Sequence, residues 1–148
     1  MDLVDFITPE LIQLQTEPEN WQEAIRIGGT LLVQQGFCNE QYVEAMIQAV
    51  HDLGPYMVLT PGISLAHARP QDGVLKEGVS IINLSKPVEF GHEINDPVSV
   101  VICFCGMDNG NHVRILQVLS SFLIEENNQD LLKTVQSKQE LLNTIHNN

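Results

Sequence analysis

Five histidines are the side chains of this sequence best suited to chemistry near neutral pH, and their settings differ. His51 lies near the end of a predicted helix, His92 in a polar turn beside Glu93, and His146 in the C-terminal tail. A solvated turn or cap accounts for each of these three. No two histidines have the i, i+4 spacing of a helical zinc site, and the three cysteines form no CxxC pair. We therefore expect no metal site.

His67 has a more informative setting. It lies in a predicted loop, 63–73, which follows a short strand and the break at Pro61-Gly62. Small neighbours leave its imidazole open to a large partner. Arg69, two residues on, projects to the same side if the segment is extended, and a guanidinium binds phosphate through two parallel hydrogen bonds. His67 is thus a candidate phosphoryl acceptor with Arg69 as phosphate ligand. On spacing alone, a structural surface histidine remains the alternative.

His112 is the second candidate. It follows a buried apolar stretch, in the segment Asp108-Asn109-Gly110-Asn111-His112, where a helix begins. Asp108 or Asn111 would cap this helix. A helix start offers free backbone N–H groups and a positive dipole end, both favourable to an anion. Sites in α/β sheets gather at strand ends, so we hypothesise that the loops of His67 and His112 converge.

The elements that must position these residues follow from hydrophobic periodicity. Apolar spacing predicts helices that open near Pro18-Glu19 and at the cap Asn39 and end near Gly36 and Gly54, followed by three C-terminal helices. Strands are predicted over 11–14, 56–60, 79–84 and 98–105, with Cys103 and Cys105 in the last as core residues. The pattern indicates one domain over residues 1–148, of α/β class (α+β being possible), with helices on both faces of a mixed sheet.

Composition narrows the class of partner. The 148 residues hold 19 acidic and 7 basic side chains, for a net charge of −12. This charge opposes binding to nucleic acid and anionic membranes, and it fits either a basic protein partner or simply solubility, which is the commoner role of an acidic surface. The N-terminus is acidic where a secretory signal would be basic, and three cysteines do not make a disulfide framework, so we expect a cytoplasmic protein. An apolar face on the last helices fits core packing or a homodimer equally.

The segment from Pro61 to Pro70, PGISLAHARP, resembles the fructose/mannitol-type EIIA domain of the phosphoenolpyruvate-dependent sugar phosphotransferase system, whose signature reads roughly P-G-[IV]-A-[LVM]-P-H-[AG]. The segments 42–47 and 112–116 also match in type and spacing. Within this family the chain looks most like the ascorbate-type subgroup, on Gly54-Pro55-Tyr56, Arg69-Pro70, Gly73-Val74, Lys86-Pro87 to Phe90 and the stretch 92–98. The resemblance implies the mixed sheet with flanking helices that was read from periodicity.

The resemblance also implies roles. His67 would be the phosphorylated histidine, through Nε2, and His112 the second active-site histidine. Phospho-HPr would be the donor and a cognate EIIB the acceptor, at a cysteine in the ascorbate group. A membrane EIIC subunit would be reached only indirectly, and no cofactor is implied. Around the phosphate we expect Arg69, His112, the hydroxyls of Thr60 or Ser64, and backbone N–H groups at the helix start.

Two departures from the family pattern matter. Ala66 stands where the signature has Pro, and Ala49 where mannitol- and fructose-type domains carry an active-site Arg. Ascorbate-type sequences look similar in lacking that Arg, and Arg69 becomes its natural substitute.

Two other interpretations of the function stay open. One is a regulatory, nitrogen-type EIIA, which accepts the phosphate to report metabolic state and takes no part in sugar transport. The other is a non-catalytic adaptor of the same fold.

Overall fold

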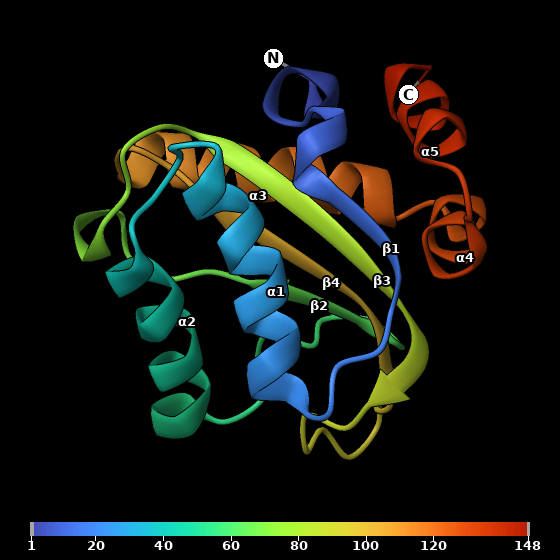
Figure 1. Cartoon of the computed structure of the whole chain (residues 1–148), viewed down its shortest axis with the longest axis horizontal. Coiled ribbons are helices and arrows are strands. Elements are labelled where there is room, and N and C mark those ends of the chain that lie inside the picture. Colours follow the sequence, from blue (N-terminus) through green and yellow to red (C-terminus); the bar gives the residue numbers. More distant parts are fainter. Residues whose placement is uncertain (1, 148) are drawn as a thin grey trace.

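In the computed structural model, which describes residues 2–147, one mixed four-stranded sheet runs in the order β1-β3-β4-β2 (Figure 1). The strands are β1 Ile12–Thr16, β2 Ile63–Ala66, β3 Gly78–Val88 and β4 Val98–Cys105. β1 is parallel to β3, β3 antiparallel to β4, and β4 parallel to β2. The carboxyl ends of β2 and β4 therefore lie at the same edge of the sheet. The ends of the predicted domain, Met1 and Asn148, lie outside the described residues.

Helices cover both faces of this sheet. In Figure 1, α1 crosses in front of the strands and α3 runs behind them. The α-helices are α1 Trp21–Gln34, α2 Glu40–Leu53, α3 Asn109–Leu123, α4 Glu126–Thr134 and α5 Lys138–His146. Short 3₁₀ turns form η1 Leu3–Phe6, η2 Pro9–Leu11 and η3 Pro70–Asp72. The predicted fold class, a mixed sheet flanked by helices, is confirmed.

The core is centred on β4. All eight residues of this strand except Ser99 are fully buried, as expected for a strand covered on both faces. Cys103 and Cys105 are core residues, as predicted. Helix α1 approaches β4 closely because Gly28 lacks a side chain; a Cβ there would lie 2.8 Å from Cys103 Sγ. Helix α1 therefore packs closely on the sheet near the carboxyl end of β4.

Asparagine caps fix where the first two helices begin. The side chain of Asn20 accepts a hydrogen bond from the backbone N–H of Glu23, so α1 begins at Trp21, slightly later than predicted. Asn39 caps α2 in the same way, as predicted. Helix α2 ends at Gly54, whose φ of 82° suits a residue without Cβ.

One predicted strand is wrong. Residues 56–60 form no strand: 56 and 57 lie in a turn, and Thr60 makes only an isolated bridge. The strand of this region is β2, inside the segment that the sequence pattern assigned to a loop. The reason is that the chain reverses before the strand, through Gly62 at φ 78°, and then Ile63–Ala66 pairs with β4. Short apolar runs on either side of a turn are hard to tell apart by pattern alone. As a result His67 directly follows a strand.

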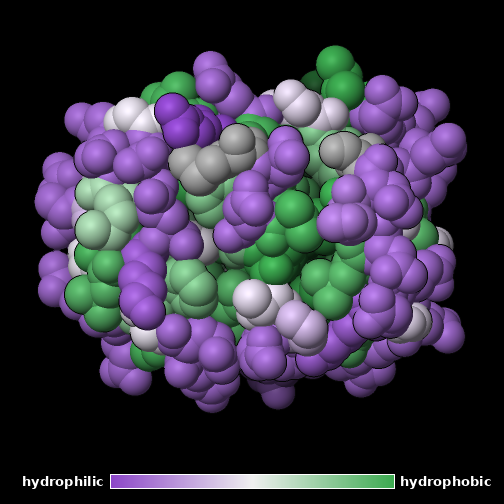
Figure 2. All heavy atoms as spheres, turned by 90° about the horizontal axis from the view of Figure 1, so that it is seen from above, coloured by the Kyte–Doolittle hydropathy of each residue, from purple (hydrophilic) through white to green (hydrophobic). Residues whose placement is uncertain are grey.

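One face of the molecule is mostly hydrophilic (Figure 2). Figure 2 shows the upper face of Figure 1, where hydrophilic side chains surround a central group of hydrophobic ones. Within residues 2–147, no helix is long and apolar enough to cross a membrane.

Candidate functional site

His67 stands at the carboxyl end of β2, beside β4. Ala66 pairs with Cys103, so the next residue along each strand brings the His67 ring against that of Phe104. The two rings stack, with centroids 5.0 Å apart and planes inclined by 27°. The ring of Tyr56 meets His67 edge-on at 6.0 Å. These contacts leave the imidazole half-buried and restrict its rotation.

One hydrogen bond sets the tautomer of His67. Its Nδ1 lies 2.9 Å from the carbonyl oxygen of Leu65. Because a carbonyl can only accept, Nδ1 carries the proton and Nε2 keeps its lone pair. Burial lowers the pKa of His67, the bond to Leu65 opposes this shift, and repulsion from His112 in its protonated form lowers the pKa further. The ring is therefore neutral at pH 7, with Nε2 as the nucleophilic atom.

His112 lies in the first turn of α3, at the carboxyl end of β4. Asp108 caps this helix by accepting a hydrogen bond of 2.8 Å from the N–H of Asn111. Gly106 allows the turn to fold back closely, because a Cβ there would lie 2.7 Å from the backbone of His112. The centroids of the His112 and His67 rings are 5.2 Å apart. The two loops converge, as hypothesised.

The environment of His112 is partly apolar. Its ring centroid lies 5.1 Å from that of Phe104. Its Nδ1 is buried and has no hydrogen-bond partner among the described residues. Burial lowers the pKa of His112 too. Two neutral imidazoles thus meet edge to face, and the ring of Phe104 packs against both.

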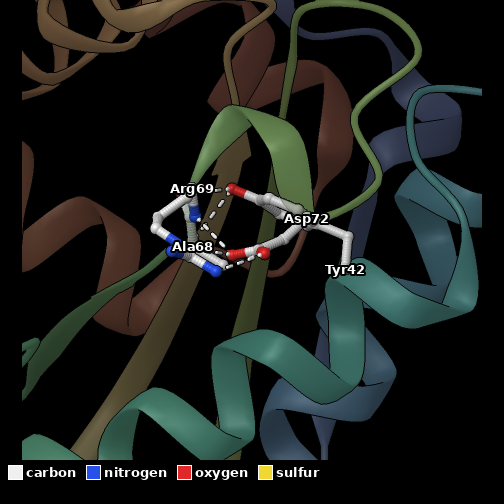
Figure 3. A network of polar contacts seen from close by, with 4 residues as sticks. All are labelled: Tyr42, Ala68, Arg69 and Asp72. Atoms are coloured by element: carbon white, nitrogen blue, oxygen red, sulfur yellow. Dashed lines mark hydrogen bonds and ion pairs between the residues drawn. The ribbon is translucent and has the colours of Figure 1, made fainter.

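His67, His112 and Arg69 line one pocket, which has a volume of about 560 Å³. Arg69 is paired with Asp72 there. Its Nε and Nη2 donate to the two carboxylate oxygens of Asp72 at 3.1 and 3.0 Å (Figure 3). This pairing raises the pKa of Arg69 and lowers that of Asp72. The guanidinium side chain is 73% exposed, so it remains accessible to an anion at the pocket mouth.

Helix α2 supplies the opposite wall of the pocket. Ala49 lies there, at the position where the resemblance places an Arg in mannitol- and fructose-type domains. The methyl group of Ala49 carries no charge, and the carboxylate of Asp52 on the same wall adds a negative charge. Arg69 is the cationic side chain that lines this pocket among the described residues.

The structure does not bring Thr60 and Ser64 to the pocket. Thr60 precedes β2, at the end of the strand opposite His67, where it forms an isolated bridge with Ile63. Ser64 is completely buried inside the sheet, and its Oγ has no hydrogen-bond partner among residues 2–147. Neither residue is among those that line the pocket with His67 and Arg69. The expectation that one of them binds phosphate therefore gains no support from the structure and stays a prediction.

The other histidines serve local structure. The ring of His51 packs against Trp21 at 5.1 Å. Nδ1 of His92 accepts hydrogen bonds from the backbone N–H groups of Ile94 and Asn95. His146 is the last residue of α5. Across the part of the chain that the structure describes, no group of three or more His, Cys, Asp or Glu is arranged to hold a metal ion.

Sequence reasoning missed three residues that shape this site. Phe104 packs against both imidazoles, Asp72 holds Arg69, and the hydroxyl of Tyr42 bonds the backbone beside His67. The pairing of Asp72 with Arg69 had a sequence signal, since the two are three residues apart across a proline that begins a turn. The contacts of Phe104 and Tyr42 depend on strand register and helix packing, which leave no local signal.

Comparisons with known proteins agree with this geometry. Residues 5–148 match the family described as "Phosphoenolpyruvate-dependent sugar phosphotransferase system, EIIA 2". The chain is similar to the ascorbate-specific PTS system EIIA component of Escherichia coli K12, with 42% identity over 136 residues, which are 90% of this chain and 88% of the relative.

Solved structures of the same kind superpose closely. The mannitol-specific cryptic phosphotransferase enzyme IIA of Escherichia coli is 32% identical, with a TM-score of 0.91 and complete coverage of both chains. The mannitol enzyme IIA of Escherichia coli, solved in complex with phosphorylated enzyme IIB, is 28% identical, with a TM-score of 0.84 over 96% of this chain and 98% of the other.

Proposed function

The chain belongs to the EIIA 2 family of the phosphoenolpyruvate-dependent sugar phosphotransferase system, and from this premise we propose that it is a phosphocarrier whose His67 accepts a phosphoryl group and passes it on. One observation carries the proposal. Nδ1 of His67 donates to Leu65, so a bare Nε2 remains on a neutral, half-buried ring beside a second imidazole. A lone pair fixed in this way suits in-line attack on phosphorus.

The transfer exchanges one phosphorus–nitrogen bond for another. The lone pair of His67 Nε2 forms a bond to the phosphorus of a donor phosphohistidine, while the donor's phosphorus–nitrogen bond breaks and its electron pair returns to the leaving imidazole. The His67 ring gains positive charge in this step. The carbonyl of Leu65, already bound to Nδ1–H, stabilises that charge without moving.

Three groups would then hold the phosphate. Arg69 lines the pocket beside Asp72. Its guanidinium would give up part of its pairing with Asp72 to donate hydrogen bonds to the phosphoryl oxygens. His112 offers a second imidazole, 5.2 Å from the first. The N-terminal turn of α3 adds backbone N–H groups and a positive dipole end. Together they offset close to two added negative charges.

The partners follow from the family and from charge. We propose phospho-HPr as donor and a cognate EIIB, of the ascorbate type, as acceptor in the cytoplasm, with EIIC reached only through EIIB. Two facts support this: relatives that are 42% identical to the chain are named ascorbate-specific, and the mannitol enzyme IIA has been solved with a phosphorylated IIB. The net charge of −12 would steer a basic surface of the partner toward the chain.

The test is an intact-mass measurement. The protein is incubated with enzyme I, HPr and phosphoenolpyruvate, alongside His67→Ala and His112→Ala. We expect an acid-labile gain of about 80 Da, one phosphoryl group, in the wild type and in His112→Ala, and none in His67→Ala. No gain in the wild type, with HPr itself phosphorylated, would reject the carrier and leave a non-catalytic adaptor.

A further inference from the structure

The hydroxyl of Tyr42 bonds two backbone segments that are far apart in the sequence. Tyr42 lies in the first turn of α2 and is completely buried. Its O–H donates to the carbonyl oxygen of Phe104 at 2.7 Å, and its oxygen accepts from the N–H of Ala68 at 3.0 Å. Figure 3 shows the side chain reaching Ala68, next to the Arg69–Asp72 pair. The phenol joins the segment after β2 to the carboxyl end of β4.

These two segments carry the two histidines of the site. Ala68 directly follows His67. Phe104 precedes Gly106, against which the backbone of His112 packs. The ring of Phe104 also lies 5.0 Å from His67 and 5.1 Å from His112. A hydroxyl that holds Ala68 against Phe104 therefore controls how the two imidazoles face each other.

The anchor itself is rigid. The N–H of Tyr42 donates to the capping side chain of Asn39, which fixes the start of α2. Burial raises the pKa of Tyr42 far above its usual range, so the phenol stays protonated and remains a donor at every physiological pH. Both of its partners are backbone groups, which do not titrate.

We propose that Tyr42 is a positioning residue for phosphoryl transfer, whose hydroxyl holds the end of β2 against the end of β4 and so sets the placement of His67 relative to His112. The inference rests on the proposed phosphocarrier function. It assigns Tyr42 no contact with phosphate or partner, since its side chain is enclosed in the core.

The test compares two variants that each lose one buried hydroxyl. Tyr42→Phe removes the bonds to Ala68 and Phe104. Ser80→Ala is the matched control, because the Ser80 hydroxyl is also completely buried and donates to a carbonyl, that of Gly28, away from the site. Single-turnover phosphorylation is followed at increasing phospho-HPr concentration, which separates the maximal rate from half-saturation. Melting temperatures are measured in parallel.

We expect both variants to melt lower by about 3 to 6 °C. Only Tyr42→Phe should transfer more slowly, with a maximal rate down about 10-fold and half-saturation unchanged, because misplacement of a reacting group slows chemistry without weakening docking. Equal rates for Tyr42→Phe and wild type would overturn the inference, as would equal slowing of Ser80→Ala. A wild type that accepts no phosphate would instead remove the proposed function on which the inference rests.

A second measurement applies if Tyr42→Phe does not fold. Amide hydrogen exchange on the unsubstituted protein reports whether the phenol holds Ala68. Protection of the Ala68 N–H comparable to that of β4 supports the inference. Exchange as fast as that of an unprotected loop amide would overturn it.

Discussion

His67 and His92 lie at opposite ends of the same sheet and use the same ring nitrogen in opposite ways. Nδ1 of His67, at the carboxyl end of β2, donates to a carbonyl. Nδ1 of His92, in the loop that leads into β4, accepts from two backbone N–H groups at 3.2 and 3.0 Å. His67 thus presents a bare Nε2, whereas His92 keeps its lone pair occupied within the turn.

The surroundings of the two loops differ in the same sense. The loop of His92 is closed by Asp96, whose carboxylate accepts from the backbone N–H groups of residues 90, 91 and 92. At the other edge, Arg69 and a pocket of about 560 Å³ face solvent. One loop satisfies its polar groups internally, and the other leaves donors and a nucleophile for something that binds. The two histidines therefore differ in the direction of the hydrogen bond at Nδ1, which leaves Nε2 of His67 as a free acceptor at the pocket.

The largest expected effect breaks this comparison directly. His67→Gln should lose all phosphoryl acceptance from phospho-HPr, because the proposed nucleophile is Nε2 of the His67 ring. His92→Gln should keep full acceptance, since its ring serves the turn. Intact mass after incubation with the donor system measures both. A phosphorylated His67→Gln, or an inactive but folded His92→Gln, would contradict the account.

A smaller effect is expected from Arg69. Arg69→Ala should slow phosphorylation about 10-fold, because it removes the cation that lines the pocket, at a site open enough for water to screen part of its effect. Arg26→Ala is the matched control: Arg26 also pairs with a carboxylate, that of Glu44, and is also exposed. Its single-turnover rate should equal that of the wild type. Equal slowing of both variants would show a general effect of charge.

The pH dependence of the phosphorylation rate tests whether the His67 ring is neutral, as the comparison with His92 requires. Because burial lowers the pKa of His67, its ring stays mostly neutral at pH 6.5, where an ordinary histidine would be half protonated. The intrinsic phosphorylation rate should therefore fall by less than about 2-fold between pH 8 and 6.5, and fall steeply only below that. Rates measured with saturating phospho-HPr test this. A 2-fold loss already at pH 6.5 would contradict a lowered pKa.

The same pKa shift has a consequence for stability. Below about pH 6.5 the unfolded chain binds a proton at His67 more readily than the folded protein does, so stability falls as pH drops from 6.5 toward the folded pKa. The free energy of unfolding should thus decrease more between pH 7.5 and 5.5 in the wild type than in His67→Gln.

The smallest effects are expected from the hydroxyls that miss the pocket. Ser64→Ala and Thr60→Val should both phosphorylate within about 2-fold of the wild-type rate, as distant substitutions do. Ser64→Ala should also leave stability unchanged or raised, because its Oγ is buried without a partner among the described residues. A large loss of rate in either variant would return that hydroxyl to the site.

The sequence was most informative where a signal is local. Asn39 and Gly54 bounded α2, the apolar run of 98–105 identified the central strand, and the setting of His67 distinguished it from the other histidines. It failed at β2, because the two sides of the Pro61-Gly62 turn are similarly apolar and only pairing with β4 selects between them. Because the strand begins at Ile63, Thr60 precedes it and lies at the end opposite His67. The contacts of Tyr42 with Ala68 and Phe104 span 26 and 62 residues of chain, so no local pattern could reveal them.

The nitrogen that carries the phosphate is the most direct test of the central claim. The protein labelled with ¹⁵N on its histidines is phosphorylated by phospho-HPr, and long-range ¹H–¹⁵N correlation identifies the modified ring atom. The account predicts phosphate on Nε2 of His67, with Nδ1 still protonated against Leu65. Phosphate on Nδ1, or on any other histidine, would contradict it.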